Sequence, residues 1–176
     1  MNMTVNDCAR AVGTCRFIEV KLMEIVAAWT PITAEMEAKV MFGRHIWDFA
    51  QHADALGKRT FELRQKEHYT VPADAGYVAL LNRVAQMQGT VERISALYDT
   101  VLPGVVRRYE SYVSATDPIL DEPSVVIMER IVADLKRQSA QARSLLRDLG
   151  MAPATQGPLA LEESKLSHLA QAGAQA

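Results

Sequence analysis

Hydrophobic residues recur along this chain at the three- and four-residue spacing of amphipathic helices, and no stretch alternates residue by residue as a strand would. The pattern predicts a first helix from about Asn6 to Trp29, with Asn6 or Thr4 as its N-cap. A second helix is predicted from about Thr33 to Lys66. Pro31 separates the two, because proline cannot continue a helix.

The same spacing predicts a third helix from about Tyr77 to Thr100, which Pro103 and Gly104 break or kink before a shorter helical segment, Val105–Ser114. A turn at residues 116–123 leads into a fourth helix that ends at Gly150. Four long helices with short links predict an all-α four-helix bundle over residues 1–150. Residues 151–176 are rich in Ala, Gln, Gly and Pro, so we expect a mostly disordered, flexible tail with a short helix at Leu159–Leu169.

Composition is that of an ordinary globular chain: 176 residues, 49% hydrophobic, 23% charged, with a formal net charge of −2. Scattered Lys and Arg give no nucleic-acid or membrane footprint, and no apolar run approaches a membrane span. The N-terminus has no basic start followed by an apolar stretch, so we expect no secretory signal and a cytoplasmic location. Cys8 and Cys15, two helical turns apart, are expected to be free thiols buried as small apolar residues.

Polar residues interrupt the apolar stripes of the first two helices. Glu19 lies in the middle of the seam that runs from Cys8 to Trp29, and a buried carboxylate needs a cation, a donor or solvent. In "GRHIWDFAQHAD", His45, Asp48 and His52 follow at i+3 and i+4 along one edge of the apolar face. Imidazole and carboxylate at this spacing suit iron, manganese or zinc.

An alternative is that His45 and His52 are boundary residues hydrogen-bonded to Asp48 and to the backbone. Counted from Pro31, however, Glu19 lies twelve residues before and His45 fourteen after, which places them at the same height in antiparallel helices. We therefore take Glu19, His45, Asp48 and His52 as candidate metal ligands.

The other two helices offer fewer ligands. In the third helix Gln88 interrupts the inner stripe and Glu92 stands at its edge; in the fourth, Gln138 lies among inward-facing residues with Asp134 at the margin. Glutamines are poor metal ligands but good neutral hydrogen-bond partners. These four residues are the candidate second side of the site.

Across residues 6–149 the chain resembles the ferritin-like superfamily. The resemblance rests on Glu19, on "GRHIWDFAQHADALGKRTFELR" and on "TDPILDEPSVVIMERIVADLKRQ", which is similar to the turn and last helix of small bacterial ferritin-like proteins. It implies a di-iron centre with a carboxylate from each of two helices and a Glu-x-x-His pair from each of the others. This sequence reads Leu135-Lys136-Arg137-Gln138 where the last pair would face the core, so the implied site is altered, with as few as one metal ion.

Two functions follow as hypotheses. The first is an iron- or manganese-dependent oxidoreductase or oxygenase of small-molecule metabolism, with a small-molecule substrate. The second is a metal-free ferritin-like pseudoenzyme that acts as a binding or assembly protein, with the polar core fixing helix register. A three-histidine metal-binding bundle is a further alternative, for which only His45 and His52 are well placed. For each of these functions a homodimer or other helical self-association is expected, with exposed Trp47 and Phe61 as contacts.

Overall fold

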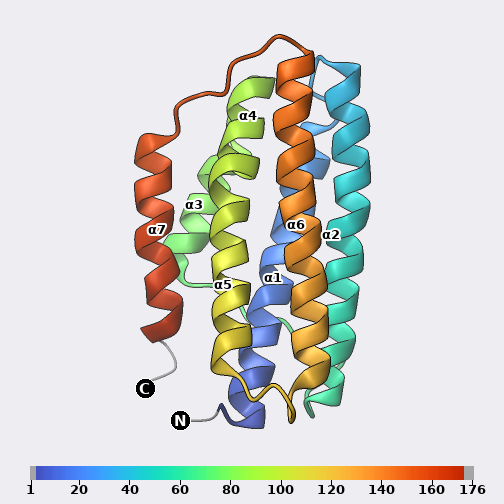
Figure 1. Ribbon diagram of the computed structural model, residues 1–176, viewed down its shortest axis with the longest axis vertical. Coiled ribbons are helices and arrows are strands. Elements are labelled where there is room, and N and C mark those ends of the chain that lie inside the picture. Colours follow the sequence, from blue (N-terminus) through green and yellow to red (C-terminus); the bar gives the residue numbers. More distant parts are fainter. Residues whose placement is uncertain (1–2, 173–176) are drawn as a thin grey trace.

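The computed structural model describes residues 3–172, with side chains for residues 3–166. All regular structure in this part of the chain is helical, which confirms the all-α prediction. Four long helical stretches lie side by side (Figure 1). They are α1 (Val5–Trp29), α2 (Met36–Glu62), the continuous run of α4 (Thr90–Ala96), η1 (Leu97–Val101) and α5 (Leu102–Ala115), and α6 (Glu122–Asp148). Two shorter helices, α3 (Ala75–Ala85) and α7 (Gly157–Ala172), lie outside them.

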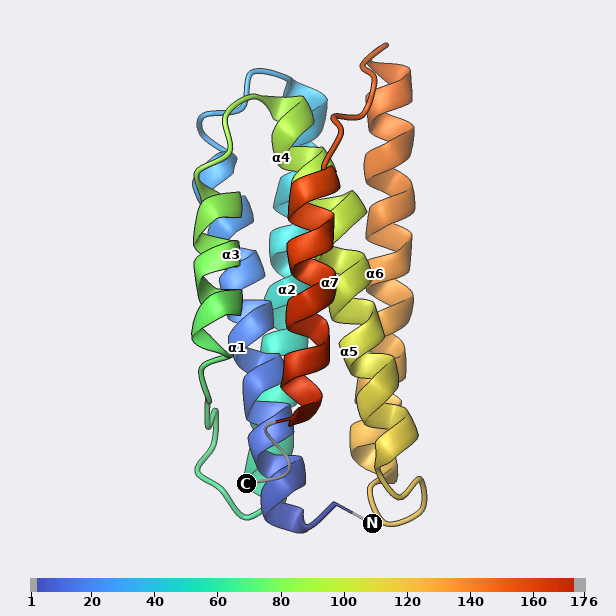
Figure 2. The same ribbon diagram turned by 90° about the vertical axis from the view of Figure 1, so that its left-hand side faces the viewer.

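The connections determine which of the four stretches run parallel and which run antiparallel. A short turn at residues 30–35 makes α1 and α2 antiparallel, as Figure 1 shows. Residues 63–74 and α3 then carry the chain back along α1, so that the α4–η1–α5 run has the same direction as α2 (Figure 2). Helix α6 returns antiparallel to α5. The topology therefore contains one long crossover, between α2 and α4.

Local signals place the helix ends close to the predicted positions. Thr4 caps α1 in a capping box: its hydroxyl oxygen accepts from the Asp7 amide at 3.2 Å, and the Asp7 carboxylate accepts from the Thr4 amide at 2.9 Å. At the end of α6, Gly150 has φ +67°, the left-handed conformation that favours glycine. Cys8 and Cys15 are both free and buried, as expected.

The predicted third helix, Tyr77–Thr100, is wrong in its continuity. Helix α3 ends at Ala85 and α4 begins at Thr90, because Gly89 at φ +75° turns the chain between them. Conversely, the expected break at Pro103 is absent. The π-helical turn η1 precedes Pro103, and the helix continues through the proline into α5. At the end of this turn the Leu102 amide donates to the Leu97 carbonyl.

The C-terminal segment is more ordered than the mostly disordered tail that we expected. Helix α7 is longer than the predicted Leu159–Leu169 and lies against α3 and α5 (Figure 2). Leu159 is buried, and Glu163 is buried beside Arg107 and Arg108 of α5. Residues 173–176, part of the predicted tail, lie outside the described residues. Within residues 3–172, none of the helices combines the length and apolar character needed to cross a membrane.

Candidate functional site

One polar cluster joins all four long helical stretches in the core. His52 of α2 lies between two carboxylates, with Nδ1 3.0 Å from Glu19 Oε2 of α1 and Nε2 3.2 Å from Asp134 Oδ2 of α6. Tyr109 of α5 completes the set: its hydroxyl donates to Glu19 Oε1 at 2.8 Å and approaches the Cys15 carbonyl at 3.2 Å. Glu19 and Tyr109 are fully buried, His52 is 5% exposed, and the Asp134 side chain is 22% exposed. We call these four residues the Glu19 cluster.

The surroundings of the Glu19 cluster shift the pKa values of His52 and Tyr109. Burial alone would lower the pKa of His52, but the hydrogen bonds and charges of Glu19 and Asp134 outweigh it and raise that pKa above 6.5. Burial, together with the Glu19 charge, raises the pKa of Tyr109 well above 10, so its hydroxyl keeps its proton and donates. This shift favours the protonated form of His52, whose ring lies between the carboxyl groups of Glu19 and Asp134, and Tyr109 donates a hydrogen bond to Glu19.

His45 does not join this cluster. Its Nδ1 lies 2.7 Å from the Tyr98 hydroxyl of η1 and its Nε2 lies 3.0 Å from Gln141 Oε1 of α6. Burial lowers the pKa of His45, so the ring is neutral: Nε2–H donates to Gln141, and Nδ1 accepts from Tyr98. The expectation that Glu19 lies level with His45 is thus wrong, whereas Glu19 does contact His52, the other histidine of the candidate set, seven residues further along α2.

The direction of the side chains explains this shift. In an α-helix each Cα–Cβ bond tilts toward the helix N-terminus. In the antiparallel helices α1 and α2, the Glu19 side chain therefore tilts away from the connecting turn and the His52 side chain tilts toward it. When two long side chains meet across a pair of antiparallel helices, their Cα atoms are therefore offset along the helix axis. Counting residues from the connecting turn ignores that offset.

Asp48 lies at the edge of the core, with different partners. Its Oδ2 accepts from Gln138 Nε2 and from Arg137 Nη2, both at 3.1 Å. Gln138 is fully buried, and its Oε1 has no hydrogen-bond partner among the described residues. Arg137 also pairs with Asp134 at 2.9 Å, which links Asp48 to the Glu19 cluster.

Two residues of the predicted second side lie elsewhere. Gln88 is exposed in the turn between α3 and α4, where its amide donates to the Gln86 carbonyl, and Glu92 is exposed in the first turn of α4. The break at Gly89 removes Gln88 from the helical stripe on which its core position was predicted. Asp134 and Gln138 do face the α2 residues, as described above.

Sequence reasoning missed the tyrosines and Gln141. Tyr98 and Tyr109 are both fully buried, and each hydroxyl bonds to a polar residue of another helix. A buried tyrosine needs a partner for its hydroxyl, so two tyrosines on core-facing stripes were the available signal. Gln141 is exposed and carried no such signal.

The donor set does not fit a resident iron or manganese ion in this arrangement. Each ring nitrogen of His45 and of His52 is already hydrogen-bonded to a protein group. Glu19 and Asp134 lie at opposite nitrogens of the His52 ring, so one ion could not bind both carboxylates and the ring without moving them. Across the described part of the chain, no group of three or more His, Cys, Asp and Glu side chains is placed to hold a metal ion.

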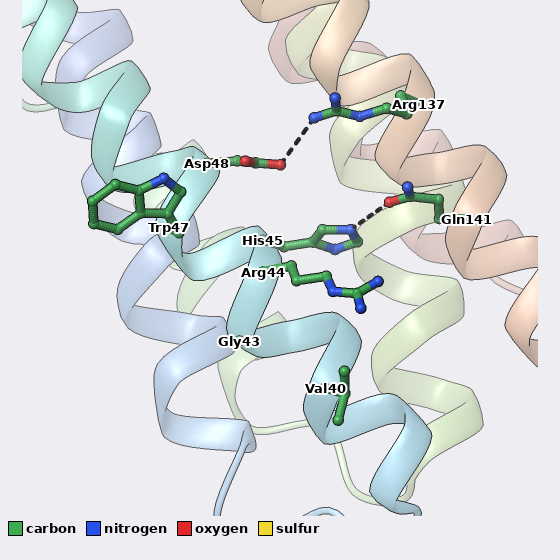
Figure 3. Close-up of a pocket in the computed structure, with 8 residues that line it drawn as sticks. All are labelled: Val40, Gly43, Arg44, His45, Trp47, Asp48, Arg137 and Gln141. Carbon is green, nitrogen blue, oxygen red and sulfur yellow. Dashed lines mark hydrogen bonds and ion pairs between the residues drawn. The ribbon is translucent and has the colours of Figure 1, made fainter.

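A pocket of about 580 Å³ lies between α2 and α6, next to His45. Figure 3 shows Arg44, His45 and Asp48 extending from α2 toward α6, and Arg137 and Gln141 extending back toward α2. The Trp47 ring points to the other side of α2. His45 thus stands at the boundary between the buried core and an accessible recess.

Comparison of the chain with protein-family models, with curated proteins and with solved structures found no match. Function is therefore inferred from the site itself.

Proposed function

We propose that the chain is a ferritin-like four-helix bundle that works as a metal-independent binding or assembly protein. The observation that carries this proposal is the state of the two core histidines: all four ring nitrogens are engaged by Glu19, Asp134, Tyr98 and Gln141. A polar network whose members satisfy one another rigidifies a core and specifies helix register, and it leaves no coordination position open.

The single crossover between α2 and α4 supports the ferritin-like part of the proposal, since bundles of that type have one long connection. The Glu19 cluster supports it too, because it takes one polar side chain from each long helical stretch, as ferritin-like metal centres do. In this chain those side chains bind one another.

The competing function is a single-metal iron or manganese oxidoreductase. The convergence of Glu19, His52 and Asp134 from three helices favours it. To bind an ion, however, His52 would have to give up at least one carboxylate hydrogen bond inside the core, and such a bond is worth about 1.5–3 kcal/mol.

Metal uptake separates the two functions. The protein is purified after growth with Fe(II) or Mn(II), and its metal content is measured beside that of His52→Gln and of His68→Gln. His68 is the matched control because its side chain is 43% exposed in a loop and makes none of the hydrogen bonds of the core network. We expect equal, substoichiometric metal in all three proteins.

The melting temperature gives a second readout on the same samples. A native-state ligand at about 100 times its Kd stabilises by about 2.7 kcal/mol, a shift of several degrees. We expect no shift on addition of either ion. One metal ion per chain that is lost in His52→Gln but kept in His68→Gln would refute the proposal and support the oxidoreductase.

A further inference from the structure

We propose that the pocket between α2 and α6 binds a small organic anion, whose carboxylate or phosphate group lies between Arg44 of α2 and Arg137 of α6. The inference rests on the proposed function, since it names the ligand class of a binding protein. The volume of the pocket, about 580 Å³, is consistent with an organic anion, because it is larger than an inorganic ion needs and falls in the range of small-molecule sites.

Hydrogen-bond donors outnumber acceptors on the pocket walls. Arg137 uses Nη2 for both of its pairs, with Asp48 and Asp134, so Nε and Nη1 stay available within the described structure. Arg44 is exposed and has no ion-pair partner among the described residues. Two guanidinium groups on opposite walls match an oxyanion, which they can bind through paired N–H donors.

Gln141 adds a donor whose orientation is set by the core. His45 Nε2 holds the Gln141 carbonyl oxygen at 3.0 Å, which leaves the amide NH2 of Gln141 to donate. His45 is thus a positioning residue that acts through Gln141. Among the described residues that line the pocket, Asp48 alone carries a carboxylate, and its Oδ2 already accepts from Arg137 and Gln138.

The pKa of His45 is consistent with two positive charges near the pocket. Burial is the main cause that lowers the pKa of His45, and the positive charges of Arg137 and Arg44 lower it further, against the Gln141 hydrogen bond and the Asp48 charge. Arg137 is already paired with Asp48 and Asp134, whereas Arg44 has no ion-pair partner among the described residues, so an anion in the pocket would pair chiefly with Arg44.

Gly43 supplies an independent observation. It lies inside α2 and lines the pocket, and a Cβ added there would meet nothing within 4 Å. Glycine in an exposed helix interior is unfavourable relative to alanine, and here none of the described residues packs against this position. Val40 and Gly43 are the aliphatic part of the lining, and we place the carbon skeleton of the organic anion against them.

Isothermal titration at constant ionic strength tests the proposal, with succinate as the carboxylate probe, inorganic phosphate as the second probe and chloride as the control. Two charge-assisted contacts correspond to a Kd of about 0.1–10 mM. We expect saturable binding of succinate or phosphate by the wild type, with the Gly43 amide resonance shifting in parallel in ¹H–¹⁵N spectra. The probe that saturates identifies the headgroup.

Arg44→Gln should weaken binding at least about tenfold, because it removes one charged partner. Arg44 is exposed, so its loss should leave folding intact. Arg130→Gln, at an exposed α6 position outside the lining, is the matched control and should bind like the wild type. Absence of saturable binding of both probes, or equal binding by Arg44→Gln, would overturn the inference. Stoichiometric metal in the uptake experiment would instead refute the proposed function and leave anion binding as a separate result.

Discussion

Glu19→Gln isolates the charge of the Glu19 cluster from its hydrogen bonds. The substituted amide keeps an oxygen to accept from His52 Nδ1 and gains an NH2 that can donate to the Tyr109 oxygen. Tyr109 can then donate to the Cys15 carbonyl, which already lies 3.2 Å away. The variant therefore preserves shape and hydrogen bonding while it removes the negative charge that faces His52.

Removing one partner of a buried ion pair costs about 3–5 kcal/mol when the other charge is left uncompensated. Because the amide keeps the hydrogen bonds, and because Asp134 still faces His52 Nε2 at 3.2 Å, we expect a loss of about 2–3 kcal/mol in the free energy of unfolding. This is a large part of the roughly 5–15 kcal/mol that stabilises a domain.

The pH dependence follows from the direction of the His52 pKa shift. In the wild type that pKa is raised in the folded protein, so the stabilisation is complete below about pH 6.5 and is lost as pH rises through the folded-state value. In Glu19→Gln the main remaining effect is burial, which lowers the pKa of His52. Asp134 still raises that pKa, so the loss of stability with rising pH should be smaller in Glu19→Gln than in the wild type.

Urea unfolding at about pH 5.5, 6.5 and 8, with an NMR titration of the His52 ring protons, measures both effects. Glu24→Gln is the control, since Glu24 is an exposed residue of α1 that pairs with Lys21 at i−3. It should change stability by no more than about 0.5 kcal/mol. If Glu19→Gln unfolds like the wild type at all three pH values, the Glu19–His52 pair is not charged and the description of the cluster is wrong.

Three further substitutions test the fold around the site. Gly43→Ala should stabilise the protein by about 0.5–1 kcal/mol, because α2 gains a better helix former with room for its methyl group, and a lower melting temperature would contradict this. Gly104→Ala should weaken the packing of α7, because the new Cβ would lie where the buried Glu163 carboxylate lies. We expect faster hydrogen exchange limited to α7, and unchanged exchange would argue against this packing. Ser139→Ala should cost about 1 kcal/mol in urea unfolding, because Ser139 Oγ donates at 3.0 Å to the Tyr98 carbonyl in the π-helical turn; no loss would mean that this carbonyl finds another donor.

Helix positions were largely predictable because they depend on local chemistry. The apolar spacing, the Thr4 cap and Gly150 act within a turn or two, so α1, α2 and α6 begin and end close to where they were expected. Pro103 was misjudged for a non-local reason. Ser139 of α6 donates to the Tyr98 carbonyl in the π-helical turn that precedes the proline, and so stabilises a turn that the local sequence does not specify.

The sequence by itself determined that Glu19 lies inside an apolar seam and that His52 lies at the edge of an apolar face, because both positions follow from helical spacing; both side chains are buried. Only the tertiary structure decided their partners. The offset of side chains in antiparallel helices pairs Glu19 with His52 and leaves His45 to Tyr98 and Gln141. Whether a polar residue is buried follows from its position on its own helix, whereas what it binds depends on how several helices are aligned along their axes.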